Sequence, residues 1–316
     1  MYLVAGVQAG YRRSGADPPW SDPRRYHGVA MEGYFWRFTQ AAAGRVAIVI
    51  SAISRAPDGA PWAFVGIATH PGRFFRWAAL HDVRADTGRH AVSAGAAFSA
   101  GPGHVLVDLG AGCRLEAALR APAGWPRRAL GALGAAQLVP GLSQYWHPHL
   151  FAADVRGSVV AGGGSWALDG ARAYAEKNWG RGFPDVWWWG QAHDFGDDVS
   201  VAFAGGPVRL GPARFDASAA VVRLDGSVLR GRPPGEMTLG DGSWRLRARA
   251  GTRLVEIEGA ADPATAHSLT VPVPDERRVV DRSHHHLAGS LRVRVSRRSR
   301  LVFSGESELA GLERGG

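Results

Sequence analysis

Lysine and asparagine are almost absent from this chain of 316 residues, which contains one of each at the adjacent positions Lys177 and Asn178. Every other side chain of the Lys/Arg class is arginine. The planar guanidinium serves well at a surface, but it does not replace a compact ammonium with three rotatable donors in a tight site. The segment that keeps both rare residues therefore holds either functional groups or a structural ion pair, and both alternatives stay open.

Cysteine is equally scarce. The single Cys113 excludes a disulfide within the chain and fits a reducing compartment. The N-terminus lacks the basic start and apolar run of a signal peptide, and no segment approaches the roughly 18 apolar residues of a membrane span. We therefore expect a cytoplasmic protein, either free or at the periphery of a membrane.

Positive charge is in excess, with a formal net charge of +9 and arginine pairs such as Arg277-Arg278 and Arg297-Arg298. Such pairs can attract anionic lipid or can simply form a solvated basic surface. No helix-turn-helix, zinc-finger or RNP pattern is present, so we expect no nucleic-acid partner.

Alternation of polar and apolar residues dominates the chain, for example in Arg45–Ser51, Arg253–Glu258 and Leu291–Val295. This period predicts strands with one buried face, and turn signals such as Asp225-Gly226 separate them. No βαβ rhythm occurs, which favours an all-β antiparallel sandwich or barrel with little helix.

Two similar halves are expected, over residues 1–145 and 146–316, with the rare Lys-Asn pair in the second half. The Pro- and Gly-rich region of residues 121–140 between them is where we expect the one helix.

Chemically rich side chains gather around the rare pair. In a strand, Tyr174, Glu176 and Asn178 share one face, and Lys177 and Trp179 the other. A second strand follows with three adjacent tryptophans, which cannot all be exposed to water. Trp187, Trp189 and Gln191 share one face of this strand, and Trp188 lies on the opposite face. A dry pocket lined by tryptophan stabilises cations, and a buried carboxyl there acts as an acid near neutral pH.

Other candidates lie outside this segment. Glu32 shares a strand face with Tyr34 and Trp36, and a lone glutamate among aromatic residues is either a paired buried charge or an acid with a shifted pKa. Histidines at His147-Pro-His149 and His284–His286 lack the accompanying pattern of a zinc site, and no Gly-x-Ser-x-Gly elbow is present. We expect neither a metal nor a hydrolase triad.

A family resemblance rests on these residues. The run Tyr174-Ala-Glu-Lys-Asn-Trp-Gly-Arg-Gly-Phe-Pro-Asp-Val-Trp-Trp-Trp-Gly-Gln191 resembles the signature of the tocopherol cyclase family. Weaker similarities occur at Glu32–Phe38, at Tyr145–Gly157 and at the terminal Ala310-Gly-Leu-Glu313. The central motif is specific, and the likeness touches both ends and the middle of the chain.

The resemblance implies two lipocalin-like β-barrels or half-barrels in tandem, and closure of a chroman ring on a prenylated hydroquinone without a cofactor. In that chemistry an acid protonates the alkene, and the phenol oxygen traps the tertiary cation. Asn178 stands where the family usually has Asp, which removes one candidate acid.

On this reading, the candidate catalytic residues are Glu32, Glu176, Lys177 and Asn178. The remaining candidates would bind the substrate: Tyr34, Trp36, His147, Tyr174, Trp179, Trp187, Trp189 and Gln191.

Three rival functions remain open at this point. The first is a non-catalytic carrier of an isoprenoid or another apolar ligand. The second is a hydratase, which differs from a cyclase only because water replaces the phenol as nucleophile. The third is a structural β-sandwich whose exposed tryptophans bind sugar rings.

Overall fold

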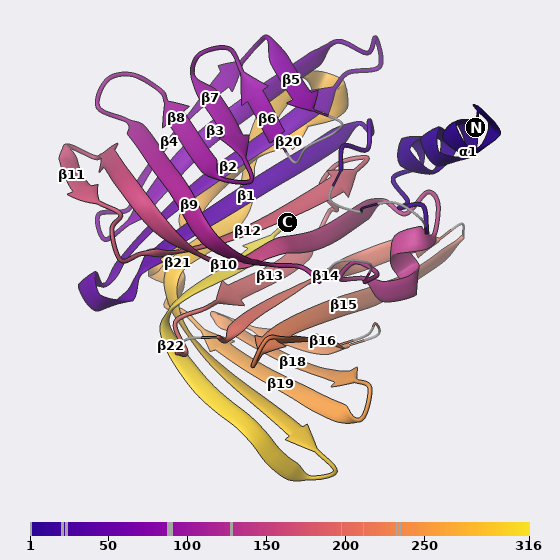
Figure 1. The fold of residues 1–316 in the computed structure, drawn as a ribbon, viewed down its shortest axis with the longest axis vertical. Helices are drawn as coiled ribbons and strands as arrows, with labels where there is room; N and C mark the ends of the chain where they lie inside the picture. Colours follow the sequence, from indigo (N-terminus) through magenta and orange to yellow (C-terminus); the bar gives the residue numbers. More distant parts are fainter. Residues whose placement is uncertain are drawn as a thin grey trace.

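The computed structural model describes residues 2–19, 22, 25–86, 91–126, 129–196, 198–210, 212–231, 233 and 235–316. Within these residues the chain forms two large antiparallel sheets, each curled around its own core (Figure 1). Most strands of the first sheet lie in the upper part of that view and most strands of the second sheet in the lower part, whereas β20 of the second sheet lies at the top, behind the first sheet. The all-β prediction with little helix is confirmed.

The first sheet has the strand order β4-β3-β2-β1-β12-β10-β9-β8-β7-β6-β5, and β11 pairs with β10. Its strands are β1 (Met31–Gln40), β2 (Arg45–Arg55), β3 (Pro61–His70), β4 (Phe74–Leu80), β5 (Val83–Asp86), β6 (Ala91–Ala94), β7 (Phe98–Gly101), β8 (His104–Asp108), β9 (Arg114–Gly124), β10 (Gln144–Ala161), β11 (Gly164–Ala167) and β12 (Arg172–Gly180).

The second sheet has the order β16-β15-β14-β13-β22-β21-β19-β18-β17, and β20 pairs with β21. Its strands are β13 (Trp187–Ala192), β14 (Ser200–Leu210), β15 (Ala213–Leu224), β16 (Ser227–Gly231), β17 (Glu236–Gly240), β18 (Ser243–Ala250), β19 (Arg253–Ala260), β20 (His267–Val273), β21 (Arg278–Arg297) and β22 (Arg300–Gly315).

The chain passes from one sheet to the other between Gly180 and Trp187, whereas the domain boundary that we predicted lies between residues 145 and 146. The reason is that β12 pairs with β1 on one side and with β10 on the other. The strand that carries Lys177 and Asn178 is therefore central in the first sheet. Independent folding of two domains stays a prediction, and we now propose the boundary where the sheets change.

Helices also differ from the expectation. The described part of region 121–140 contains only the 3-10 turn η2 (Gly134–Leu138), whereas the α-helix α1 spans Tyr2–Arg13. The other 3-10 turns are η1 (Ala41–Ala43), η3 (Pro263–Thr265) and η4 (Pro274–Glu276). Glycines and prolines, which favour turns, explain why region 121–140 forms no longer helix. No helix among the described residues is long and apolar enough to cross a membrane.

Alternation along the strands divides the aromatic residues among three cores. Tyr34, Trp36 and Phe38 pack inside the first sheet, and Trp188 packs inside the second. A third cluster, which includes Trp146 and Trp189, lies where the two sheets meet. The outer face of β12 and the outer face of β13 are thus turned toward each other.

Candidate functional site

A cavity of about 300 Å³ lies between the two sheets, a volume typical of small-molecule sites. Strands β1, β2, β3, β10 and β12 of the first sheet and β13, β14, β15, β20, β21 and β22 of the second contribute to its walls. Most lining side chains are apolar or aromatic. Phe215 belongs to the lining and is 47% exposed, so the cavity reaches the surface beside β15.

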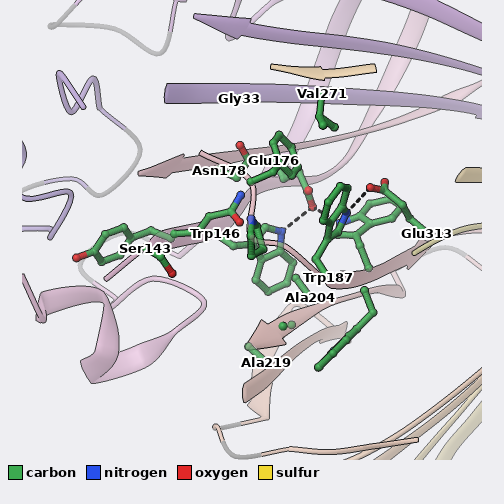
Figure 2. Close-up of a pocket in the computed structure, with 18 of the residues that line it drawn as sticks. Gly33, Ser143, Trp146, Glu176, Asn178, Trp187, Ala204, Ala219, Val271 and Glu313 are labelled. Carbon is green, nitrogen blue, oxygen red and sulfur yellow. Dashed lines mark hydrogen bonds between the residues drawn. The ribbon is translucent and has the colours of Figure 1, made fainter. Parts of the chain in front are cut away.

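Glu176 is the buried carboxyl on the first-sheet wall. Period-two geometry turns Tyr174, Glu176 and Asn178 to the outer face of β12, and Glu176 and Asn178 line the cavity. Three neutral donors reach the same oxygen of Glu176, Oε2: the hydroxyl of Tyr174 at 2.6 Å and the indole N–H groups of Trp146 and Trp189, each at 2.9 Å. Figure 2 shows Trp146 reaching Glu176.

The environment of Glu176 disfavours its charge. Burial raises the pKa of Glu176 to about 7, although the hydrogen bonds from Tyr174, Trp189 and Trp146 act in the opposite direction. The negative charge of Glu313 raises this pKa as well. No cation is among these causes. Glu176 therefore keeps its proton to a higher pH than an ordinary carboxyl does.

The three tryptophans of β13 are all buried, as expected, because glycines on neighbouring strands leave room for their rings. A Cβ at Gly315 would lie 2.0 Å from the Trp187 ring, and one at Gly205 would lie 2.2 Å from Nε1 of Trp188. Trp187 and Trp189 face the first sheet, and Trp188 faces the core of the second. The aromatic walls of the cavity thus depend on these close approaches.

A second carboxylate, Glu313 of β22, lines the opposite wall. Nδ1 of His285 lies 2.7 Å from its Oε2, and Trp187 donates its indole N–H to Oε1, as Figure 2 shows for Trp187. Burial raises the pKa of Glu313, but the hydrogen bond and the charge of His285, together with the hydrogen bond from Trp187, outweigh it and leave the pKa below its ordinary value. The cavity therefore holds two carboxyl groups whose pKa values are shifted in opposite directions, that of Glu176 upward and that of Glu313 downward.

Asn178 contributes an amide to the same wall. Its partner across the sheet is Gly33, where a Cβ would lie 2.1 Å from Oδ1 of Asn178. That oxygen has no hydrogen-bond partner among the described residues, although it is buried. The amide is placed to meet a polar group of a ligand.

Lys177 points the opposite way, into a buried charged cluster made of Lys177, Glu32, His27 and Asp17. Its Nζ lies 3.0 Å from the carbonyl oxygen of Arg25, 3.2 Å from Nδ1 of His27 and 3.8 Å from Oε1 of Glu32. Its partners come from the segment before β1 and from β1 itself.

The groups of this charged cluster are buried and pair with one another, outside the cavity. Burial lowers the pKa of Lys177 to about 8, while the charges of Glu32 and Asp17 raise it. Glu32 also accepts hydrogen bonds from the backbone N–H groups of His27 and Gly28. Neither Glu32 nor Lys177 lines the cavity. Trp179 lies beside this cluster, stacked on His27 at 4.2 Å between ring centroids.

The remaining predicted site residues divide between the cavity and the cores. Tyr34 is among the lining residues, as are Trp187 and Trp189. Tyr174 stands behind Glu176, and Trp36 packs in the first core. Two others are not among the lining residues. His147 accepts a hydrogen bond from the backbone of Ala132, and Gln191 contacts His193.

Histidines of the 284–286 run have separate partners. His285 pairs with Glu313, and His286 lies 3.0 Å from the hydroxyl of Thr265. Among the described residues, no three His, Cys, Asp or Glu side chains come together in a way that could hold a metal ion.

Sequence reasoning missed His285, Glu313 and Trp146 as cavity residues. Glu313 stood in the terminal Gly-Leu-Glu similarity, and His285 stood in the histidine run, but neither pattern shows which strand faces β12. That information comes from the pairing of β22 with β13 and with β21.

A family model described as tocopherol cyclase-like matches residues 108–316. The chain belongs to this tocopherol cyclase-like family. The match covers β12, β13 and β22, so Glu176, the three tryptophans and Glu313 all lie within it.

Two curated relatives are plant proteins. The chloroplastic tocopherol cyclase of Zea mays is 28% identical over 222 residues, which cover 64% of this chain and 46% of that protein. The probable chloroplastic tocopherol cyclase of Oryza sativa subsp. japonica is 29% identical over 170 residues, which cover 49% of this chain and 36% of that protein. The matched region spans less than half the length of either relative.

Two solved structures share the fold. Kievitone hydratase from Nectria haematococca superposes with a TM-score of 0.55 at 11% identity, over 90% of this chain and 88% of that chain. A putative AttH from Nitrosomonas europaea gives 0.51 at 14% identity, over 91% and 92%. At such identities these likenesses describe the fold alone, and they agree with the tandem β architecture of this family member.

Proposed function

We propose that this chain is a cyclase that closes a chroman ring on a prenylated hydroquinone. Family membership supports this proposal, and the observation that carries it is Glu176, a carboxyl with a pKa of about 7 on the wall of a tryptophan-lined cavity. Alkene protonation needs an acid that keeps its proton at neutral pH and surroundings that tolerate a cation, and the cavity combines both.

In the proposed reaction, Glu176 transfers its proton to one carbon of the trisubstituted alkene. Tyr174, Trp146 and Trp189 then stabilise the carboxylate that remains, because their three N–H and O–H donors already point at Oε2. The rings of Trp187 and Trp189 face the developing tertiary cation with their negative π-clouds.

The substrate's orientation follows from the shape of the cavity. Glu176 is buried and Glu313 is 14% exposed, and the lining near Phe215 and Val208 is apolar and reaches the surface. We therefore place the aromatic head and the reacting alkene beside Glu176 and the rest of the prenyl tail toward this opening. Asn178 would bind a hydroxyl of the ring through its Oδ1.

The mass of the product separates this proposal from its rivals. Purified protein incubated with a geranylgeranyl-substituted hydroquinone should yield an isomer of the same mass that lacks one phenol hydroxyl. A product heavier by one water indicates a hydratase, and bound substrate that is recovered unchanged indicates a carrier. Glu176→Gln should reduce formation of the isomer by about 100-fold or more, which is the usual contribution of a general acid.

Contact with membranes is a separate part of the proposal. We expect a cytoplasmic protein whose basic surface, including the exposed Arg297 and Arg298, meets anionic lipid from which an apolar substrate is drawn. Each arginine near such a surface contributes about 1 kcal/mol at low salt. Flotation with phosphatidylserine vesicles should occur at low salt and decline at high salt. If the protein does not float with the vesicles, or if flotation does not depend on salt, the proposed contact with anionic lipid is wrong.

A further inference from the structure

Glu313 is not explained by the protonation step, although it shares the cavity with Glu176. It stands on β22 of the second sheet, and Glu176 stands on β12 of the first. The Glu313 side chain is 14% exposed and lines the cavity. The two carboxyl groups therefore face one cavity from opposite walls.

The partners of the two groups differ in kind. Glu176 receives hydrogen bonds from two indoles and a phenol, all on Oε2. Glu313 receives an indole N–H on Oε1 and lies with its Oε2 against the His285 ring. As a result the pKa of Glu176 is raised and that of Glu313 is lowered. Two carboxyl groups whose environments separate their pKa values in this way are a typical acid and base pair.

A purely structural carboxylate in this chain looks different. Glu32 is fully buried, accepts two backbone N–H groups and has Lys177 and Arg55 each 3.8 Å away. Glu313 pairs with the His285 ring at 2.7 Å, has no Lys or Arg within ion-pair distance among the described residues, and lines the cavity with a side chain that is 14% exposed. Its placement suits a group that meets a ligand.

We propose that Glu313 is the general base of the reaction, that its carboxylate receives the proton of the nucleophilic hydroxyl, and that His285 is a positioning residue that holds this carboxylate. The proposal rests on the proposed function and extends it to the second half of the reaction. It places the nucleophilic hydroxyl of the substrate at the second-sheet wall of the cavity, beside Trp187 and Glu313.

The bonds and protons balance in this scheme. The π electrons of the alkene form a C–H bond with the proton of Glu176 and leave a tertiary cation. A lone pair of the phenol oxygen forms the C–O bond, the O–H bond breaks, and the proton passes to Glu313. After product release, water carries a proton from Glu313 back to Glu176. The product is an isomer of the substrate, and no oxidant or reductant is needed.

A deuterium experiment separates the two halves of the reaction. In D₂O, protonation by Glu176 labels the alkene, and a cation that is not trapped returns to labelled alkene. Wild type, Glu313→Gln and the control Glu308→Gln are each incubated with a geranylgeranyl hydroquinone. Two quantities are measured, namely the amount of chroman formed and the deuterium content of the recovered alkene. Glu308 suits as a control because it is an exposed glutamate on the same strand.

Glu313→Gln should lower chroman formation by about 100-fold while the recovered alkene still gains deuterium. Glu308→Gln should match wild type in both measurements. His285→Leu should also lower chroman formation, and His285→Gln, which keeps an N–H donor for Glu313, should restore part of it at an equal melting temperature.

Two results would overturn the assignment of Glu313. One is chroman formation by Glu313→Gln at the wild-type rate, and the other is parallel loss of chroman and of label at an unchanged melting temperature. In both cases wild type still makes chroman, so the proposed function survives. If wild type neither labels nor cyclises the substrate, the proposed function fails, and the base assignment fails with it.

Discussion

Trp187 and Trp189, two residues apart on β13, donate their indole N–H groups to two different carboxyl groups of one cavity. Trp187 reaches Glu313 on its own sheet, and Trp189 reaches Glu176 across the gap between the sheets at 2.9 Å. The Trp189 ring also lies 5.4 Å from the His285 ring, measured between centroids. A single short strand therefore sets the environments of both carboxyl groups, and this relationship yields the following predictions.

Cyclisation should decline as pH rises through about 7, because Glu176 loses the proton that it must donate. The measurement is kcat/KM between pH 5 and 9 with a prenylated hydroquinone. Asp17 has a pKa of about 7 as well, but it belongs to the cluster around Lys177 and does not line the cavity. The Asp17→Asn variant should therefore show the same decline of kcat/KM with rising pH as wild type. A rate that is flat or rising through pH 8 would contradict the role of Glu176.

Trp189→Phe should move this decline to higher pH. The indole hydrogen bond lowers the pKa of Glu176, so its loss raises that pKa, while phenylalanine keeps an aromatic ring in the wall. Trp77→Phe is a matched control, because Trp77 is partly exposed on β4 and does not line the cavity. If kcat/KM of Trp189→Phe falls at the same pH as in wild type, or at a lower pH, Trp189 does not act on Glu176.

Glu176→Gln should stabilise the protein more at pH 8 than at pH 5. The pKa of Glu176 is raised from 4.5 to about 7 in the fold, so the unfolded chain releases its proton at a lower pH than the folded chain. Wild-type stability therefore falls between these values by up to about 3 kcal/mol, and glutamine removes this loss. Urea unfolding at both pH values measures the difference. A difference that stays constant or shrinks with rising pH would contradict the shift.

Lys177→Met should destabilise the protein by about 3 kcal/mol, because it leaves the buried carboxylates near Lys177 without their ammonium partner. Arg172→Met is the matched control on the same strand, since Arg172 pairs with Asp154 at an exposed position and should cost at most about 1 kcal/mol. The melting temperatures of the two variants give the comparison. If Lys177→Met melts like wild type and yet loses cyclisation, Lys177 acts in the reaction and not in the fold.

Period-two patterns predicted much of the fold and one wall of the site. Strands have a strict two-residue repeat, so the faces of Tyr174, Glu176 and Asn178 follow from the sequence once the strand is recognised. The burial of three adjacent tryptophans follows because so much apolar surface cannot remain wet on both faces of a strand.

The opposite wall could not be predicted in this way, because alternation says nothing about which strand lies across a gap. Glu313 is 137 residues from Glu176 along the chain, the difference between their residue numbers, and it arrives only through the pairing of β22 with β13. The partners of Lys177 were missed for the same reason. The carbonyl of Arg25 and the ring of His27 belong to an irregular segment that has no periodic pattern to read.

Proton transfer from Glu176 to the alkene is the central claim, and deuterium in the product tests it most directly. Wild type in D₂O should convert a geranylgeranyl hydroquinone to a chroman that carries one deuterium on the carbon next to the new C–O bond, and Glu176→Gln should produce almost none at an equal or higher melting temperature. A chroman without deuterium at that carbon, or labelled chroman formed by Glu176→Gln at the wild-type rate, would contradict the account.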